Sequence, residues 1–333
     1  MRNFIIVLLL GCVLISCNKI SSNYVNFRGF VQGTTYNITY SSVDSIVYKD
    51  QIEALLAVFD TSLSTYNKQS LITKINNNKS KKTDEYFNEV FEKSKEVYTK
   101  TNGAFDITVA PLVNYWGFGF KNKDEIADTS IVSILNYVGL DKVKLSNSII
   151  EKADPRVTID ANAIAQGYSV DIVAKFLDTK GVSNYLIEIG GELKTKGVNK
   201  KGKVWRIGID RPFDNNNIPG QNLQAIIKLQ DKSLATSGNY RKFYERDGIK
   251  YSHTINPKTG YPVNHTLLSV TVIADDCMTA DAYATAFMVL GLEKSLQLIK
   301  KLDNIEAYFI YSDKNGKYQV KSTPEIKKLI TEV

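Results

Sequence analysis

The spacing of apolar residues along this chain switches repeatedly between that of a helix and that of a strand, without a regular alternation of the two. Apolar residues three and four apart predict helices over Ser45–Phe59, Tyr86–Thr101 and about Ala163–Lys180. An alternating pattern predicts a strand hairpin or bulged strand over Phe27–Tyr40, broken at Gly33. Because these elements do not follow the order of a doubly wound sheet, the pattern favours an α+β fold.

The other predicted elements extend this mixed pattern to the end of the chain. No sequence repeat or low-complexity linker divides it, so we expect one continuous domain over residues 27–333. The remaining expected elements are strands at Val157–Ile159, Tyr185–Ile189, Lys203–Ile209, Leu223–Leu229, Leu268–Ile273 and Ala307–Tyr311, helices at Ser130–Val138, Thr279–Leu290 and Pro324–Glu332, and a loop at Lys121–Asp128.

The first seventeen residues are typical of a targeting segment. Arg2 precedes an apolar run, Phe4–Ile15, that is too short for a permanent membrane helix. The run ends in Leu-Ile-Ser-Cys, which resembles a bacterial lipobox with lipid attachment at Cys17 after cleavage. We therefore predict a signal peptide over 1–16, a lipidated tether over 17–26 and a body anchored on the extracytoplasmic (periplasmic) face of a bacterial membrane. The alternatives are a plain secretory signal and an anchor that is never cleaved.

Composition narrows the chemistry that the chain can perform. With 43% hydrophobic and 23% charged residues among 333, it is an ordinary globular protein, and its net charge of +7 is not gathered in a basic block that would favour nucleic acid. Two histidines and three cysteines are too few for a His/Cys zinc or iron site, so we expect any metal to be a hard cation bound by oxygen. After processing, Cys277 would be the only free thiol, which excludes an intrachain disulfide.

Two clusters in the first half of the chain are candidates for ligand contacts. Thr101–Thr108, followed by Trp116–Gly119, places a carboxylate on a glycine-hinged turn beside aromatic rings, as a ring or ribose contact would require. The alternative is a helix stop, a turn and a strand. Asp160, Gln166–Tyr168 and Asp171 lie near a predicted helix start, where phosphate is favoured. The alternative there is an N-cap aspartate with a packing glycine.

A third cluster combines Thr236–Gly238 with the segment Tyr251–Pro262. The hydroxyl and N–H groups of Thr-Ser-Gly suit an oxyanion or a phosphate. His253 is the one histidine in a motif-like setting, and it can be either structural or catalytic.

The fourth cluster contains a carboxylate and a hydroxyl at helical spacing. Asp281 and Thr285 are four residues apart and so share one side of a predicted helix. Together they can ligate Mg²⁺, while the alternative is an aspartate near a helix start with an inward-facing threonine.

Taken in order, these clusters closely resemble the FAD:protein FMN transferase (ApbE-type) lipoproteins. The resemblance extends over about Phe27–Lys300, and the ordered set of motifs is specific although each motif is weak alone. The matching stretches are Gly33–Tyr36, Phe59-Asp60 with Ser64–Tyr66, Gly103–Thr108, Trp116–Gly119, Ile189–Glu192, Thr236–Gly238, Ser252-His253, Pro257 with Gly260 and Pro262, and Ala280–Ala286.

The resemblance implies an α+β fold with FAD in a cleft between two lobes, and an enzyme that uses FAD as a substrate. It would transfer FMN through a phosphoester to a threonine or serine of an acceptor flavoprotein, such as a subunit of a membrane redox complex, and release AMP. By position, the implied residues are Gln32, Tyr66, Ala104, Phe105, Asp106, Asp160, Gln166 and Ile255 for FAD, Asp281, Thr285 and the backbone carbonyl of Ala163 for Mg²⁺, and His253 for catalysis.

The chain departs from the family pattern at four positions, two of which are implied FAD contacts. Gln32 stands where methionine is usual and Gln166 where a charged residue is common, while Asn239 and Asn256 each replace a frequent aspartate. The histidine and the metal pair are all present. Two other functions remain open at this stage, a Mg²⁺-dependent FAD pyrophosphatase and a non-enzymatic flavin-binding lipoprotein.

Overall fold

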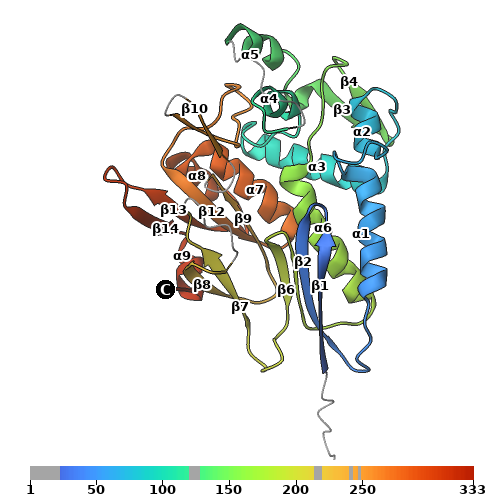
Figure 1. Ribbon diagram of the computed structural model, residues 1–333, viewed down its shortest axis with the longest axis vertical. Coiled ribbons are helices and arrows are strands. Elements are labelled where there is room, and N and C mark those ends of the chain that lie inside the picture. The colour runs from blue at the N-terminus through green and yellow to red at the C-terminus, as the bar shows by residue number, and fades with distance from the viewer. Residues whose placement is uncertain (1–22, 120–127, 214–219, 240–242, 247–248) are drawn as a thin grey trace, which may run out of the picture.

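The computed structural model describes residues 23–119, 128–213, 220–239, 243–246 and 249–333 (Figure 1). The predicted leader with Cys17 and residues 121–127 of the predicted loop lie outside these ranges. In the described ranges the elements mix in an α+β fold, which confirms the predicted fold class. None of the described helices is long and apolar enough to cross a membrane.

An eight-stranded antiparallel sheet forms the centre of the molecule. It starts with a hairpin whose turn residues, Gln32 and Gly33, have φ values of 54° and 75°. The order is β1-β2-β5-β6-β9-β12-β13-β14. These strands are β1 (Asn23–Val31), β2 (Thr34–Ser42), β5 (Tyr185–Ile189), β6 (Glu192–Lys196), β9 (Ser233–Gly238), β12 (Leu267–Ala274), β13 (Glu306–Ser312) and β14 (Tyr318–Ser322).

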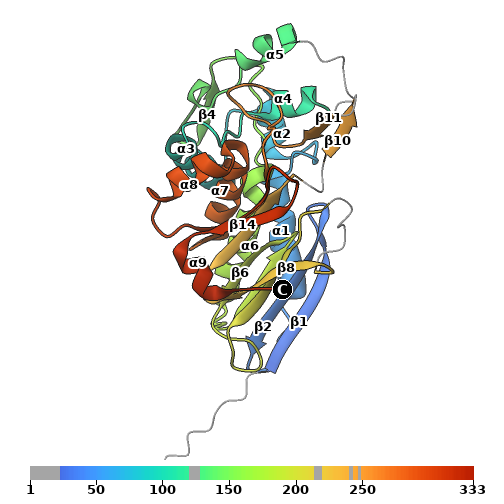
Figure 2. The same ribbon diagram turned by 90° about the vertical axis from the view of Figure 1, so that its left-hand side faces the viewer.

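Helices cover one face of this sheet, as Figure 2 shows. The alternation of side chains along a strand decides which residues they contact. Val270 and Val272 of β12 are fully buried in the cluster that includes these helices, whereas Ile273 packs on the opposite side of the sheet. The covering helices are α1 (Lys49–Leu63), α6 (Asn162–Thr179), α7 (Cys277–Leu290) and α8 (Leu292–Ile299).

A small three-stranded sheet covers part of the other face. It has the order β15-β8-β7 and packs, together with α9, against β6, β9, β12 and β13 around Trp205, Ile227 and Ile310. Its elements are β7 (Trp205–Asp210), β8 (Leu223–Leu229), α9 (Pro324–Leu329) and β15 (Ile330–Glu332).

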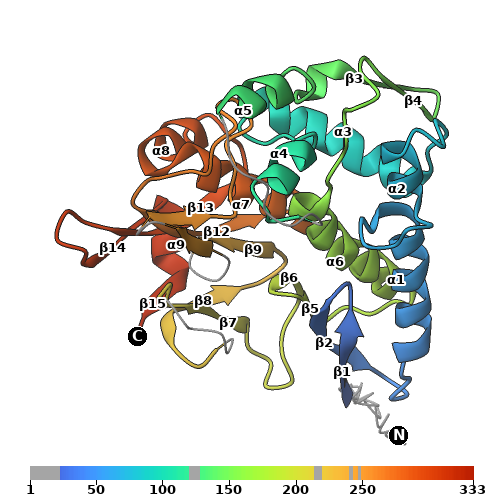
Figure 3. The same cartoon turned by 45° about the horizontal axis from the view of Figure 1, so that its top comes forward.

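The remaining elements gather beyond one end of the central helices (Figure 3). Trp116 and Ile255 belong to a separate apolar cluster there. The elements are α2 (Leu71–Asn76), α3 (Glu85–Lys100), α4 (Ala110–Tyr115), α5 (Asp128–Leu135), the 3-10 turn Leu140–Lys142, and the hairpins β3 (Val143–Ser146) with β4 (Ile149–Lys152) and β10 (Phe243–Arg246) with β11 (Ile249–Ser252).

Several sequence-based predictions of secondary structure differ from the structure. The helix predicted over Ser45–Phe59 begins at Lys49 and ends at Leu63. Val157–Ile159 is not a strand, because the backbone of Ile159 pairs with a side chain. Its N–H donates to Asn76 Oδ1 at 2.7 Å and its carbonyl accepts from Asn76 Nδ2 at 2.8 Å. The helix predicted over Pro324–Glu332 ends at Leu329, since Ile330–Glu332 pairs with β8 instead.

Candidate active site

Helices α6 and α7 cross in close contact at Gly167. A Cβ atom at this position would lie 2.4 Å from the Cys277 backbone oxygen and 2.8 Å from the Asp281 Cβ, so only glycine allows the approach. The Gly167 N–H donates to Asp281 Oδ2 at 3.0 Å. The crossing therefore places the Asp281 carboxylate directly on the backbone of α6.

This hydrogen bond also bears on the Ala163 carbonyl. In a regular α-helix the N–H of residue 167 bonds to the carbonyl of residue 163. Here Asp281 competes for that donor, which leaves the Ala163 oxygen with capacity to bind another group. The Asp281 carboxylate and the Ala163 carbonyl, which the family resemblance implies as metal ligands, thus compete for the Gly167 N–H group.

Burial controls the charge of Asp281. The side chain is 5% exposed, and this desolvation raises the pKa of the carboxyl to about 7, although the Gly167 N–H opposes the rise. Thr285 lies one turn further along α7, with its Oγ1 3.4 Å from Ser237 Oγ of β9. Carboxylate, hydroxyl and carbonyl oxygens are the donors that Mg²⁺ prefers, so this set fits the implied metal. Among the described residues, no group of three or more His, Cys, Asp or Glu side chains is placed to hold a metal ion.

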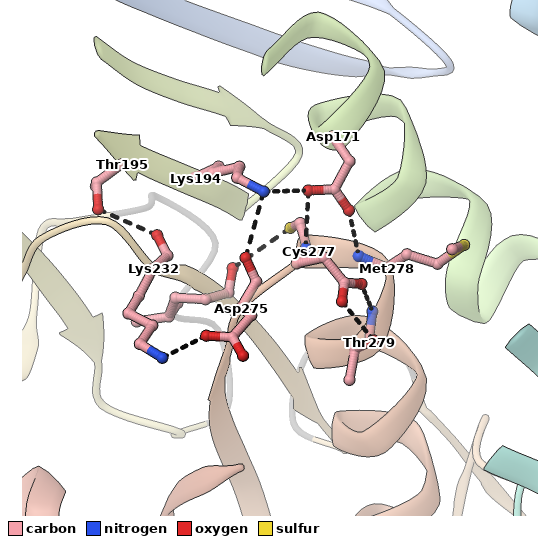
Figure 4. Close-up of polar contacts among 10 residues, drawn as sticks. Asp171, Lys194, Thr195, Lys232, Asp275, Cys277, Met278 and Thr279 are labelled. Carbon is pink, nitrogen blue, oxygen red and sulfur yellow. Dashed lines mark hydrogen bonds and ion pairs between the residues drawn. The ribbon is translucent and has the colours of Figure 1, made fainter. Parts of the chain in front are cut away.

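Asp171 of α6 holds the beginning of α7, as Figure 4 shows. Its Oδ1 accepts from the Cys277 N–H at 3.0 Å and its Oδ2 from the Met278 N–H at 2.8 Å, while Lys194 Nζ donates to Oδ1 at 3.0 Å. These two N–H groups have no partner within α7, and a carboxylate is favoured at a helix N-terminus.

Asp171 thus makes a second contact between the same two helices. Gly167 and Asp171 are four residues apart on α6, as Cys277 and Asp281 are on α7, so the two contacts lie one turn apart on both helices. Together they fix the rotation of α7 and the direction of Asp281. The local sequence pattern predicts no role for Asp171 in orienting α7, and its spacing of four residues from Gly167 is the one signal of this contact that the sequence contains.

Of the two glutamines with an implied role in FAD binding, Gln32 lies in the hairpin turn and Gln166 lies beside it. Gln166 Nε2 donates to the Ile189 carbonyl at 3.0 Å, and Gly190, whose N–H donates to the Thr35 carbonyl at 2.9 Å, leaves room for that side chain. Gln32 Nε2 is buried without a hydrogen-bond partner among the described residues. Burial raises the pKa of the nearby Asp60 carboxyl, and the Gln32 side chain opposes this rise.

Asp106 and Asp160 are brought together by the segment between Phe105 and Thr108. The Asp160 N–H donates to the Ile107 carbonyl at 2.7 Å. Asp106 accepts from the Thr108 N–H and hydroxyl at 2.8 and 2.6 Å and from the Leu140 N–H at 3.2 Å. Burial nevertheless raises the pKa of Asp106 to about 6. Asp106 also lines a pocket of about 240 Å³ together with Gly103, Pro257 and Lys258.

Three of the implied FAD residues have buried side chains. Ala104, Phe105 and Ile255 are 5%, 2% and 5% exposed, and Phe105 and Ile255 belong to apolar clusters of the core. These three residues therefore offer little surface to a ligand. Tyr66, by contrast, is 74% exposed, so its ring is accessible to a flat ligand.

His253 lies on the segment that connects to the end of β9. Thr254 Oγ1 donates to Asn239 Oδ1 at 2.7 Å, and Asn239 directly follows β9, which carries Ser237. The His253 ring is half-buried and meets the ring of Phe118 edge to face, with centroids 6.4 Å apart. The fold therefore joins the histidine to the strand that borders Thr285.

The close helix crossing gives a first prediction. Gly167→Ala should lower the free energy of unfolding by about 2–3 kcal/mol, because the new methyl group meets backbone of α7 that cannot rotate away. Denaturant unfolding measures this loss. Gly208→Ala is the matched control, since its Cβ would meet only the flexible end of Leu223. An unchanged midpoint for Gly167→Ala would contradict the close crossing.

Comparisons with known proteins agree on one family. The model of the ApbE family matches residues 32–309. A protein of Vibrio cholerae named FAD:protein FMN transferase is 36% identical over 305 residues, which cover 89% of this chain and 90% of that protein. The protein of the same name from Escherichia coli K12 is 32% identical and covers 91% of this chain and 88% of its own length.

Solved structures show the same likeness. The flavin transferase ApbE from Vibrio cholerae superposes with a TM-score of 0.83 at 33% identity and covers 92% of this chain and 99% of its own. The apo form of the flavinyl transferase ApbE from Pseudomonas stutzeri gives a TM-score of 0.82 at 33% identity, covering 92% and 97%.

Proposed function

This chain belongs to the ApbE family and is a transferase, and on that premise we propose that it is a Mg²⁺-dependent FAD:protein FMN transferase. It cleaves FAD at the pyrophosphate and attaches FMN to a threonine or serine of an acceptor flavoprotein. The acceptor oxygen forms a bond to the FMN phosphorus, the bond from that phosphorus to the bridging oxygen breaks, and AMP leaves with that oxygen.

The observation that carries this proposal is the buried Asp281 carboxylate, which the Gly167 N–H holds against the backbone of α6, with Thr285 one turn further along α7. Asp281, Thr285 and the Ala163 carbonyl would hold Mg²⁺, which when bound neutralises pyrophosphate oxygens. Phosphoryl transfer depends on positioning and charge stabilisation more than on covalent help from the protein. The contacts of Gly167 and Asp171 supply that positioning.

The other site residues would orient the two substrates. The exposed ring of Tyr66 offers a face for the isoalloxazine, and the backbone at Ala104–Asp106 together with Asp160 would hold the rest of FAD. His253 would accept the proton of the acceptor hydroxyl, because histidine changes its charge near neutral pH.

The location that we propose follows from the leader. Cys17 would carry acyl chains that anchor the protein on the periplasmic face of a bacterial membrane. Subunits of membrane redox complexes would then be acceptors within reach.

The test combines the purified full chain with FAD, Mg²⁺ and a flavin-acceptor domain from the same organism. In-gel fluorescence and a mass gain on the acceptor, both lost with EDTA, are expected. Free FMN and AMP without an adduct would instead identify a pyrophosphatase, and bound but intact FAD a flavin carrier.

Metal binding should depend on pH through Asp281. Because burial raises the pKa of this carboxyl to about 7, a proton competes with Mg²⁺ at lower pH. The affinity should fall about tenfold for each pH unit below about 7 and level off above it. Calorimetric titration of Mg²⁺ from pH 5.5 to 8 measures this. A flat profile would argue against Asp281 as the ligand.

A further inference from the structure

Apolar side chains gather on the loop between β2 and α1. Val43, Ile46 and Val47 are 62%, 46% and 58% exposed. Backbone and side-chain hydrogen bonds fix this loop. The Tyr40 hydroxyl donates to the Ile46 carbonyl at 2.7 Å and accepts from the Tyr48 N–H at 2.9 Å. The three apolar side chains are therefore held outward by a defined backbone.

This loop lies beside the first described residue of β1. Asn23 pairs with Ser42 at the end of β2, and its Nδ2 donates to Ser45 Oγ at 3.1 Å. The chain before Asn23 leads back to Cys17, six residues earlier. At an extended length of about 3.3–3.6 Å per residue, six residues reach at most about 20 Å, so a lipid on Cys17 would keep this end of the sheet near the bilayer.

A lysine-rich turn lies at the same end of the sheet. Lys200, Lys201 and Lys203, between β6 and β7, are exposed and form no ion pair with any residue that the structure describes. The turn is tied to the first strands because the Tyr24 hydroxyl donates to the Val198 carbonyl at 2.7 Å. Figures 1, 2 and 3 all place this turn beside the start of β1.

Acidic groups at this end do not cancel the charge of the turn. Asp178 pairs with Lys196 at 2.9 Å, and Asp231 accepts from the Gly197 N–H at 2.8 Å. Lys49 lies 3.9 Å from Glu53, whereas Lys200, Lys201 and Lys203 pair with no acidic side chain that the structure describes.

We propose that this end of the sheet is a second membrane contact, a surface that rests on an anionic bilayer beside the lipid anchor. Val43, Ile46 and Val47 enter the interface, and the lysines of the turn contact lipid phosphates. The inference rests on the proposed anchor, because Cys17 brings this face to the bilayer. It adds a fixed orientation that a tether alone cannot give.

The orientation has a consequence for the candidate site. β1 has nine residues and so spans about 30 Å at about 3.3 Å per residue. Its far end is the turn at Gln32, beside Gln166 and Gly190. On this proposal the site is held about 30 Å from the bilayer surface.

The test uses the full chain, purified with its lipid and placed in vesicles of phosphatidylglycerol and phosphatidylethanolamine. An environment-sensitive fluorophore is attached to Val47→Cys or, as the matched control, to Phe30→Cys, a 72% exposed apolar position at the other end of β1. Cys277 is fully buried and stays unlabelled. Brominated lipid should quench the probe at 47 at least twofold more than the probe at 30. Equal, solvent-like signals would overturn the proposal.

A charge variant separates this surface from the anchor. Lys200→Glu, Lys201→Glu and Lys203→Glu together should halve the quenching at 47, whereas Lys314→Glu and Lys317→Glu, on the turn between β13 and β14, should not. Equal effects of the two sets would overturn the role of the turn.

The lipid anchor and the transferase activity can each be tested independently of the proposed membrane contact. Labelling of Cys17 would show that the chain is not lipidated. Binding to anionic but not to phosphatidylcholine vesicles in sedimentation would then support the surface, and binding to neither would overturn it. Absence of FMN transfer would refute the proposed function without altering the quenching result.

Discussion

Asp281→Asn is expected to lower kcat for FMN transfer by at least about a thousandfold while leaving the protein folded. The substitution keeps the shape of the side chain and an oxygen for the Gly167 N–H, but it removes the charge that would bind Mg²⁺. The measurements are acceptor flavinylation and Mg²⁺ titration, with Asp275→Asn as a control, since Asp275 is exposed and paired with Lys232. Undiminished transfer would reject the metal assignment.

The same variant should be at least as stable as the native chain without metal. The folded-state pKa of Asp281, about 7, lies above the ordinary value of about 3.9, so the folded protein binds more protons than the unfolded one between these values. Stability therefore falls as pH rises from about 4 to about 7, and asparagine removes this loss. At pH 7.5 the variant should gain roughly 2–4 kcal/mol in the free energy of unfolding. If Asp281→Asn instead lost as much free energy of unfolding as Gly167→Ala is expected to lose, its missing activity would be explained by a damaged structure.

The fold could be predicted where local pattern and tertiary environment agree. β5 and β8 have the predicted bounds because their apolar residues face buried clusters on a sheet. β9 was missed since Ser-Leu-Ala-Thr-Ser-Gly lacks a strand pattern, and its conformation comes from pairing with β6 and β12. The apolar run Val157–Ile159 has a strand pattern but is not a strand. The side chain of Asn76, far away in the sequence, forms the hydrogen bonds with Ile159 that a neighbouring strand would otherwise form.

Part of the candidate site could likewise be predicted from local sequence patterns, and part could not. Asp281 and Thr285 could be paired from the sequence because helical spacing alone puts them on one side of α7. The contact of Asp281 with Gly167 joins residues 114 apart, and the contacts of Asp171 with α7 join residues 106 and 107 apart. A local sequence pattern cannot reveal contacts between residues so far apart in the sequence. The role of Asp171 in orienting α7 is therefore visible only in the packing of the two helices.

His253→Ala should lower FMN transfer by about 10²–10⁴-fold, as the loss of a general base does, and leave FAD binding unchanged. His253 is half-buried on a segment tied to β9 through Asn239, so the substitution removes a ring without opening the core. Quenching of flavin fluorescence measures binding, and single-turnover flavinylation measures transfer.

The control for this prediction is the other histidine of the chain. His265 bonds to the Met288 carbonyl through Nε2 at 2.7 Å, so His265→Gln should leave transfer near the native rate. A general base also predicts two further results for His253→Ala: loss of the rise of kcat/KM with pH, and partial rescue by added imidazole. A variant with lower FAD affinity but a native rate at saturation would instead make His253 a binding residue, because its loss would then affect FAD and not the proton of the acceptor.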